Sequence, residues 1–217
     1  MTGRTDAQTH GRTDALRLVV ILDEQAAGGR DLADLAAAVV RGGATMLQVR
    51  AKGLRAGALA DLTRRVIAAA GDVPVLVNDR LDVALAAGAA GCHLGQDDFP
   101  ISDARKMVPA GFLLGGSAGN ADEARRATAA GAHYLGVGPV HATAHKDDAG
   151  AAIGVAGFAR VREATALRCV AIGGVTVNDI PALLAAGATG IAVVGAVLAA
   201  PDAAQATSML RDALAGS

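Results

Sequence analysis

The sequence predicts a single-domain α/β fold, a closed (β/α)8 TIM barrel, from three observations. Eight short apolar runs alternate with alanine-rich segments of helical spacing along the 217 residues. The apolar runs are nearly continuous, as in parallel strands that are buried on both faces. No linker or change of composition marks a second domain. An open doubly wound sheet is the alternative, but such sheets more often stop at five or six strands.

Each predicted element follows from its own pattern. Apolar, β-branched runs predict strands at residues 18–22, 45–49, 75–77, 91–94, 112–116, 133–137, 169–172 and 190–194. Helical spacing of alanine and leucine predicts helices at residues 31–42, 57–70, 80–87, 102–108, 121–130, 155–165, 177–186 and 196–214. Gly-Ala pairs follow four of these helices, where glycine supplies a left-handed C-cap, at residues 43–44, 88–89, 131–132 and 187–188.

The first segment of the chain differs from the rest. Residues 1–16 are polar and irregular, which predicts a disordered N-terminal tail before a catalytic barrel at residues 17–217. The segment lacks the apolar core of a secretory signal, and Asp6 and Asp14 argue against a transit peptide.

One uncharged stretch approaches the length of a membrane span. It covers residues 182–200, but Gly187 and Gly190 interrupt it and β-branched residues follow them. We therefore expect a buried helix-turn-strand unit and no association with a membrane.

The composition argues against nucleic-acid binding and favours a reducing compartment. The net charge is −1 and aromatic residues make up 2% of the chain, so neither a basic surface nor stacking platforms for nucleic acid are expected. Cys92 and Cys169 each lie inside an apolar run, which favours free buried thiols in a reducing, cytoplasmic location over a disulfide. The sequence leaves the oligomeric state open, a homodimer included.

Polar residues alternate at the end of the second expected strand. Gln48, Arg50 and Lys52 share one face of that strand because side chains alternate along it. An exposed strand end is one interpretation. In a barrel, however, helices cover the outer face, so the three side chains should point into the barrel mouth, where two cations need an anion such as a phosphate.

Two acids follow the third and fourth expected strands. Asp79 comes directly after Asn78, and Asp98 comes directly after Asp97. The carboxyl ends of barrel strands meet on the rim that carries the active site, so we expect both acids there. Each acid could instead be a helix N-cap. Two carboxylates that converge beside Arg50 suit Mg2+, which commonly binds one or two carboxylates together with phosphate oxygens.

Glycine-rich turns and one long loop complete the expected rim. Gly173-Gly174 and Val194-Gly195 follow the seventh and eighth strands, the usual phosphate site of these barrels. Residues 135–150 form a long polar loop, which is either a mobile surface loop or a lid that brings Lys146 to the phosphates. The rim therefore predicts one cationic site for a diphosphate and one backbone site for a monophosphate.

These motifs, in this order over residues 45–196, resemble those of the thiamine phosphate synthase family. The matching segments are QVRAK, VNDRLDVALAAGAAGCHLGQDD, GGSAGN, GVGPVHATAHK, AIGGV and AVVGAV. The resemblance implies that hydroxymethylpyrimidine diphosphate and thiazole phosphate are joined, with release of diphosphate. It implies no nucleophilic side chain, because the C–O bond to diphosphate breaks before the thiazole nitrogen attacks.

The resemblance also implies roles for individual residues. Asp79 and Asp98 would bind Mg2+, and Arg50, Ser117 and Lys146 would act in catalysis. The pyrimidine diphosphate would contact Gln48, Arg50, Lys52, Asn78, Ser117 and Lys146. The thiazole phosphate would contact Thr143, His145, Gly173 or Gly174, Val194 and Gly195. Ser117 is expected to orient substrate without a neighbouring base.

Three positions depart from the family pattern: Gly119 replaces His or Thr, His145 replaces Thr, and Gly195 replaces Ser. Alternatives remain for the function. A related barrel that isomerises thiazole phosphate could use His141 or His145 as acid and base. A sugar-phosphate epimerase and a non-catalytic phosphate-binding barrel are the others. His93 and His133 are expected in the core or behind the site.

Overall fold

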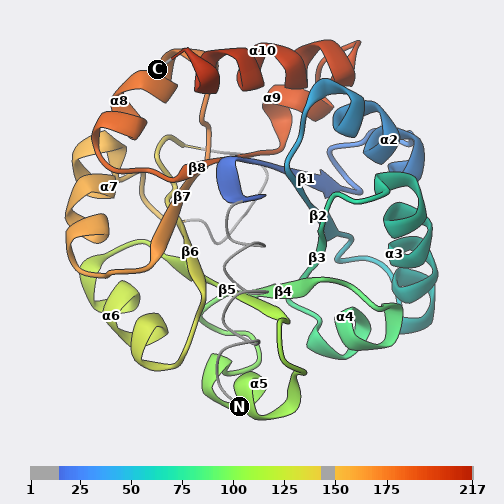
Figure 1. Cartoon of the computed structure of the whole chain (residues 1–217), viewed down its shortest axis with the longest axis horizontal. Coiled ribbons are helices and arrows are strands. Elements are labelled where there is room, and N and C mark those ends of the chain that lie inside the picture. The colour runs from blue at the N-terminus through green and yellow to red at the C-terminus, as the bar shows by residue number, and fades with distance from the viewer. Residues whose placement is uncertain (1–14, 143–149, 217) are drawn as a thin grey trace.

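A computed structural model of the chain describes residues 15–142 and 150–216, and these residues form a closed barrel of eight parallel strands ringed by helices (Figure 1). The predicted fold is confirmed. The strands are β1 (Leu18–Asp23), β2 (Met46–Arg50), β3 (Val75–Asn78), β4 (Gly91–Leu94), β5 (Leu113–Ala118), β6 (Tyr134–Val137), β7 (Arg168–Ile172) and β8 (Gly190–Val193).

Helices alternate with these strands in the order that the sequence predicts. They are η1 (Ala15–Arg17), α2 (Leu32–Gly42), α3 (Ala56–Ala70), α4 (Leu81–Ala87), α5 (Ile101–Met107), α6 (Ala121–Ala129), α7 (Gly154–Glu163), η2 (Val177–Asp179), α8 (Ile180–Ala185), α9 (Gly195–Leu198) and α10 (Ala203–Ala215). None of the helices in residues 15–142 and 150–216 has the length and apolar character that crossing a membrane requires.

The four Gly-Ala stops behave as predicted. Gly43, Gly88, Gly131 and Gly187 have φ angles of 100°, 74°, 93° and 88°, which lie in the left-handed region. A side chain with a Cβ rarely adopts this conformation, so glycine lets each helix end and the chain turn into the next strand.

Apolar side chains form two separate layers. The larger cluster lies between the strands and the helices, and the smaller one fills the inside of the barrel. The interior cluster includes Leu16, which is fully buried although the sequence analysis assigns residue 16 to the tail. Leu16 is the last apolar residue before the first strand, and burial in the barrel interior explains why it is ordered.

The last predicted helix, residues 196–214, is wrong in one respect, because α9 and α10 divide it. Pro201 lies between them and disfavours helical geometry in the residue before it. Asp202 then caps α10, and its carboxylate accepts a hydrogen bond from the Gln205 N–H at 3.0 Å.

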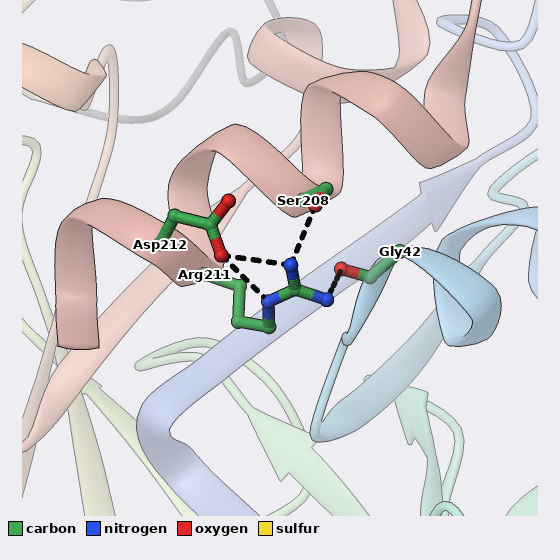
Figure 2. A network of polar contacts seen from close by, with 4 residues as sticks. All are labelled: Gly42, Ser208, Arg211 and Asp212. Atoms are coloured by element: carbon green, nitrogen blue, oxygen red, sulfur yellow. Dashed lines mark hydrogen bonds and ion pairs between the residues drawn. The ribbon is translucent and has the colours of Figure 1, made fainter.

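The first and last strands close the barrel, and α10 packs against α2 on the outside of this seam (Figure 1). Gly42, the last residue of α2, permits the close approach, because a Cβ there would lie 2.6 Å from the Thr207 Cβ. Arg211 of α10 donates to the Gly42 carbonyl at 3.3 Å and also contacts Ser208 and Asp212 (Figure 2). Arg211 therefore satisfies a carbonyl that the end of α2 leaves without an intrahelical donor.

Candidate active site

A cavity of about 390 Å³ opens at the carboxyl ends of the strands, where barrel enzymes hold their substrates. We call it the central cavity. Nine of the predicted site residues line it: Gln48, Arg50, Asn78, Asp79, Ser117, Gly173, Gly174, Val194 and Gly195. Strands β2, β3, β5, β7 and β8 thus bring residues from distant parts of the sequence to one place.

A second cavity of about 360 Å³, the rim cavity, adjoins the central one. Lys52 and Asp98 line the rim cavity, and Asn78 and Asp79 line both. Asp97, Gln96 and Glu123 add polar side chains to the rim cavity. The two cavities therefore adjoin, and the lining of the central cavity is mainly apolar while that of the rim cavity is mainly polar.

The predicted stripe on β2 points into the barrel mouth. Gln48 is 4% exposed and lines the central cavity with Arg50, while Lys52 lines the rim cavity. The interpretation as a solvated strand end is wrong for Gln48 and Arg50, which the inner face of the barrel shields from solvent. Lys52 lies in the turn after β2 and is exposed.

Arg50 forms an ion pair with Asp23, the last residue of β1, which the sequence analysis missed. The Asp23 side chain is 4% exposed and also accepts a hydrogen bond from the Ala26 N–H at 2.9 Å. Asp23 holds the Arg50 guanidinium in place and neutralises part of its charge. The signal that could have identified Asp23 is the one used for Asp79, namely an acid at the end of an apolar strand.

Asp79 and Asp98 lie together on the rim cavity, and neither caps a helix. Arg80 and Pro100 occupy the N-cap positions of α4 and α5, without side-chain capping bonds. The Asp98 carboxylate instead accepts from the Gly95 N–H at 2.6 Å, inside its own turn. Asp79 has a φ of 63°, uncommon for a residue with a side chain, and its N–H donates to the His93 carbonyl at 2.8 Å.

Ser117 has a histidine beside it, contrary to the prediction that no base is near. The His93 Nε2 atom lies 3.1 Å from the Ser117 Oγ, and the His93 Nδ1 atom lies 3.0 Å from the Tyr134 hydroxyl. All three side chains line the central cavity. The strand pairing brings them together, because β4, β5 and β6 are neighbours in the sheet, and no spacing in the sequence reveals this contact.

His133, by contrast, lies away from both cavities. Its Nδ1 atom accepts from the Leu114 N–H at 2.8 Å, and Arg105 lies 3.0 Å from its Nε2 atom. Burial of the ring, helped by the nearby Arg105 cation, lowers the pKa of His133 to about 4. A neutral imidazole at ordinary pH fits a structural position better than an acid and base.

The two glycine turns follow β7 and β8 and line the central cavity. Gly173 and Gly174 have φ angles of 90° and 66°, and Gly195 begins the short helix α9. A Cβ at Gly173 would lie 2.7 Å from the Pro139 Cα, so glycine lets this turn approach the loop after β6. Gly173, Gly174 and Gly195 all line the central cavity.

Three predicted residues of the long loop, Thr143, His145 and Lys146, lie outside the described residues. The loop is described as far as Ala142, which lines the central cavity. The His141 Nε2 atom lies 2.9 Å from the Asp179 carboxylate, within hydrogen-bond distance. Burial opposes ionisation of Asp179, but hydrogen bonds from Thr176 and His141 outweigh it and lower the pKa of Asp179.

The two cysteines are free and buried, as predicted. Burial raises the pKa of the Cys169 thiol to about 11, and burial together with neighbouring carboxylates raises the pKa of Cys92 further. Neither thiol belongs to the residues that line the two cavities.

Known proteins resemble this chain over most of its length. The thiamine-phosphate synthase of Methanoculleus marisnigri is 44% identical over 202 residues, which are 92% of this chain and 96% of that protein. The thiamine-phosphate synthase of Salinispora tropica is 54% identical over 156 residues, or 71% of this chain and 75% of that protein.

Solved structures agree with the sequence relatives. The thiamine phosphate pyrophosphorylase from Pyrococcus furiosus aligns with a TM-score of 0.85 and 32% identity, covering 94% of this chain and 97% of that one. A 3-hexulose-6-phosphate synthase aligns with a TM-score of 0.67 and 21% identity, covering 91% of this chain and 99% of that one. The second likeness shows the barrel fold alone. The family model described as thiamine monophosphate synthase matches residues 18–197, and the chain belongs to this family.

Proposed function

We propose that the chain is a transferase that joins hydroxymethylpyrimidine diphosphate to thiazole phosphate, giving thiamine phosphate and diphosphate. The observation that carries the proposal is the shared position of Asp79 and Asn78, which line both the central and the rim cavity. A pyrimidine ring in the mainly apolar central cavity would therefore have its diphosphate in the polar rim cavity, beside the carboxylates and cations.

The diphosphate would bind to Arg50 and Lys52, with Lys146 of the long loop as a third cation. Arg50 is already paired with Asp23, so its guanidinium would share its donors between the buried carboxylate and the phosphate oxygens. The planar fork of arginine, with five N–H donors, allows both contacts at once. Asn78 would add an amide donor between the two cavities.

The donor set fits a magnesium ion held by Asp79 and Asp98. Within residues 15–142 and 150–216, no group of three or more His, Cys, Asp or Glu side chains is arranged to hold a metal by itself. Mg2+ commonly keeps several waters and takes one or two carboxylates with substrate phosphates, so two carboxylates on the rim cavity suffice. Bound there, Mg2+ would withdraw negative charge from the departing diphosphate.

The residues of the chain would act mainly by position and charge. The C–O bond to diphosphate would break first, and both electrons would leave with the diphosphate. The pyrimidinylmethyl cation that remains is stabilised by its amino-substituted ring, and the thiazole nitrogen then forms the new C–N bond. Arg50 would stabilise the leaving group and Gln48 would orient the ring in the central cavity. Ser117 would donate a hydrogen bond to the diphosphate where the two cavities adjoin.

The thiazole phosphate would bind opposite, at the backbone of Gly173 or Gly174 and of Val194 and Gly195. These turns line the central cavity, so the nucleophile would face the pyrimidine ring within the same cavity. By the same resemblance, Thr143 and His145 would contact the thiazole phosphate. Gly195 has no hydroxyl, so its backbone N–H would replace the family's serine as the donor.

The substrates that we propose are phosphorylated small molecules, with no nucleic acid or membrane partner. A cytoplasmic location and a tail before the barrel are part of the same proposal. The alternatives of a thiazole-phosphate isomerase, a sugar-phosphate epimerase and a non-catalytic phosphate-binding barrel receive less support. The relatives that match this chain over most of its length are named as synthases.

The direct experiment mixes the purified protein with the two phosphorylated precursors, with and without Mg2+, and follows diphosphate by phosphorus NMR. We expect thiamine phosphate and diphosphate in equal amounts, and only when Mg2+ is present. Diphosphate release without the thiazole substrate would indicate hydrolysis instead of transfer. No product in the presence of Mg2+ would contradict the proposal.

A further inference from the structure

Hydrogen bonds connect three side chains, Tyr134, His93 and Ser117, from the barrel interior to the central cavity. The Tyr134 hydroxyl lies 3.0 Å from the His93 Nδ1 atom, and the His93 Nε2 atom lies 3.1 Å from the Ser117 Oγ. Tyr134 is 3% exposed and belongs to the interior apolar cluster. This hydrogen-bonded series therefore begins at Tyr134 in the core and ends at Ser117, which lines the central cavity.

Two glycines make room for this arrangement. A Cβ at Gly115 would lie 2.5 Å from both the His93 Nδ1 atom and the Tyr134 Cε1 atom, and a Cβ at Gly136 would lie 3.1 Å from the His93 Cε1 atom. Glycine is disfavoured inside strands and often marks close approach of another group. Gly115 on β5 and Gly136 on β6 have no side chains, and the Tyr134 and His93 rings occupy the space that is left.

The direction of each hydrogen bond follows from the tyrosine. In the described part of the chain, His93 is the one hydrogen-bond partner of the Tyr134 hydroxyl. Burial raises the pKa of this phenol, so it stays protonated and its proton needs an acceptor. The unprotonated Nδ1 atom of His93 supplies that acceptor, which places the imidazole proton on Nε2.

The proton of the Ser117 hydroxyl must then point away from His93. The N–H at His93 Nε2 donates to the Ser117 Oγ, so the Ser117 proton turns away from the histidine. Ser117 lines the central cavity, and His93 is the one partner of its hydroxyl within the described residues. The opposite tautomer would make Ser117 donate to His93 and would present only an acceptor to an anionic substrate.

We propose that Tyr134 is a positioning residue, which fixes the His93 tautomer and thereby makes Ser117 a hydrogen-bond donor to a phosphate-bearing substrate. The proposal rests on the proposed function for the identity of that substrate, the pyrimidine diphosphate. Tyr134 acts through two other side chains, and it needs no contact with the substrate.

The test uses a Tyr134→Phe variant, which removes the hydroxyl and keeps the ring in the core. Nitrogen NMR of histidine-labelled protein without substrate reports which ring nitrogen of His93 carries a proton, and a His93→Gln variant assigns the signal. We expect the Nε2–H form in the unaltered protein and a mixture of tautomers in Tyr134→Phe. Thr207→Val is the matched control, because it removes another buried hydroxyl, which donates to the Ala203 carbonyl in α10.

Binding of inorganic pyrophosphate, measured by calorimetry with Mg2+, provides a second readout that does not depend on turnover. We expect Tyr134→Phe and Ser117→Ala each to weaken pyrophosphate binding about 10-fold, the usual effect of losing one good hydrogen bond. The double variant should be little weaker than either single one, because both remove the same donor. Thr207→Val should bind pyrophosphate like the unaltered protein.

Two results would overturn the proposal. One is a Nδ1–H or doubly protonated His93 in the unaltered protein, which needs no folded variant to observe. The other is Tyr134→Phe with an unchanged tautomer and unchanged pyrophosphate affinity. Failure of the proposed function is distinguishable, since it would leave the tautomer result intact while no thiamine phosphate formed.

Discussion

The carboxylate of Asp23 and the guanidinium of Arg50 form a buried ion pair across the first two strands of the barrel. Their side chains are 4% and 13% exposed, and their Cα atoms are register partners in the β1–β2 ladder. Arg50 is therefore held before any ligand arrives. An arginine oriented in this way loses little side-chain freedom when it binds a diphosphate.

Asp23→Asn should destabilise the protein and increase the stabilisation that pyrophosphate gives. Loss of one partner of a buried pair costs about 3 kcal/mol of unfolding free energy, because the other charge remains buried. Pyrophosphate with Mg2+ would supply a replacement anion for Arg50, so it should raise the melting temperature more in the variant than in the unaltered protein. Thermal unfolding with and without pyrophosphate measures both effects.

Asp61→Asn is the control for this comparison. Asp61 pairs with Arg64 at the surface, where the two side chains are 77% and 52% exposed. Its replacement should change the unfolding free energy by less than about 0.5 kcal/mol. A similar small effect at Asp23 would mean that the Arg50 pair is not held in the free protein.

Asp98→Asn should lower kcat by about 10²–10³-fold, the usual cost of losing one electrostatic stabiliser of a transition state. The amide keeps the shape of the side chain and can still accept the Gly95 N–H, but it binds Mg2+ poorly. The Mg2+ concentration that gives half-maximal activity should rise as well. Asp103→Asn on α5, whose carboxylate pairs with Lys106 at the surface, should leave both quantities unchanged.

Gly115→Ala should lower both stability and kcat, because it displaces the rings that pack behind Ser117. The added methyl group would overlap the His93 and Tyr134 rings, and overpacking of this kind costs about 1–3 kcal/mol. Displacement of His93 by about 1 Å should lower kcat by up to about 100-fold. Steady-state kinetics and denaturant unfolding test the two expectations separately.

Gly57→Ala on α3 is the matched glycine control. A Cβ at Gly57 meets nothing within 4 Å, so alanine should stabilise the protein by about 0.5 kcal/mol and leave kcat as it is. An equal response of Gly57→Ala and Gly115→Ala would contradict the role given to the space at Gly115.

Stability should fall between pH 6.5 and pH 4 in part because of His133. Its pKa is lowered from 6.5 to about 4 by burial and by Arg105, so the folded state resists protonation that the unfolded state accepts. The contribution of the neutral ring is therefore complete above the unfolded pKa and is lost as the pH falls. Arg105→Gln should raise the pKa of His133, which an NMR titration measures, and should reduce this loss of stability.

The comparison for this variant is Arg125→Gln. Arg125 pairs with Asp122 on the exposed side of α6. Removal of a cation that is not beside His133 should leave the His133 titration unchanged. A shift of equal size in both variants would show that total charge, and not the Arg105 contact, sets the pKa.

The barrel was predictable from the sequence because its signals are local and repeated. Apolar runs, helical spacing and left-handed glycine stops recur along the chain, and each strand begins within one residue of its expected start. The division between α9 and α10 was missed, although Pro201 followed by Asp202 is a local signal for it.

The site was only partly predictable, because its missing parts depend on strand pairing. Gln48, Asp79 and Asp98 could be placed by the rule that strand ends meet on one rim. The contacts of Arg50 with Asp23 and of Ser117 with His93 need the register and the side-chain directions of neighbouring strands. The interpretation of Asp79 and Asp98 as caps failed because the short turns after β3 and β4 start their helices at later residues.

The pairing of β1 with β8 affects how the protein is made. A ribosome delivers β1 early, while the strand that completes its other edge emerges last. During that interval the apolar first strand has unpaired backbone groups on one side, which other nascent or unfolded chains could join. Productive folding therefore depends on keeping that edge away from such chains until translation reaches the eighth strand, a task suited to chaperones that hold nascent polypeptides.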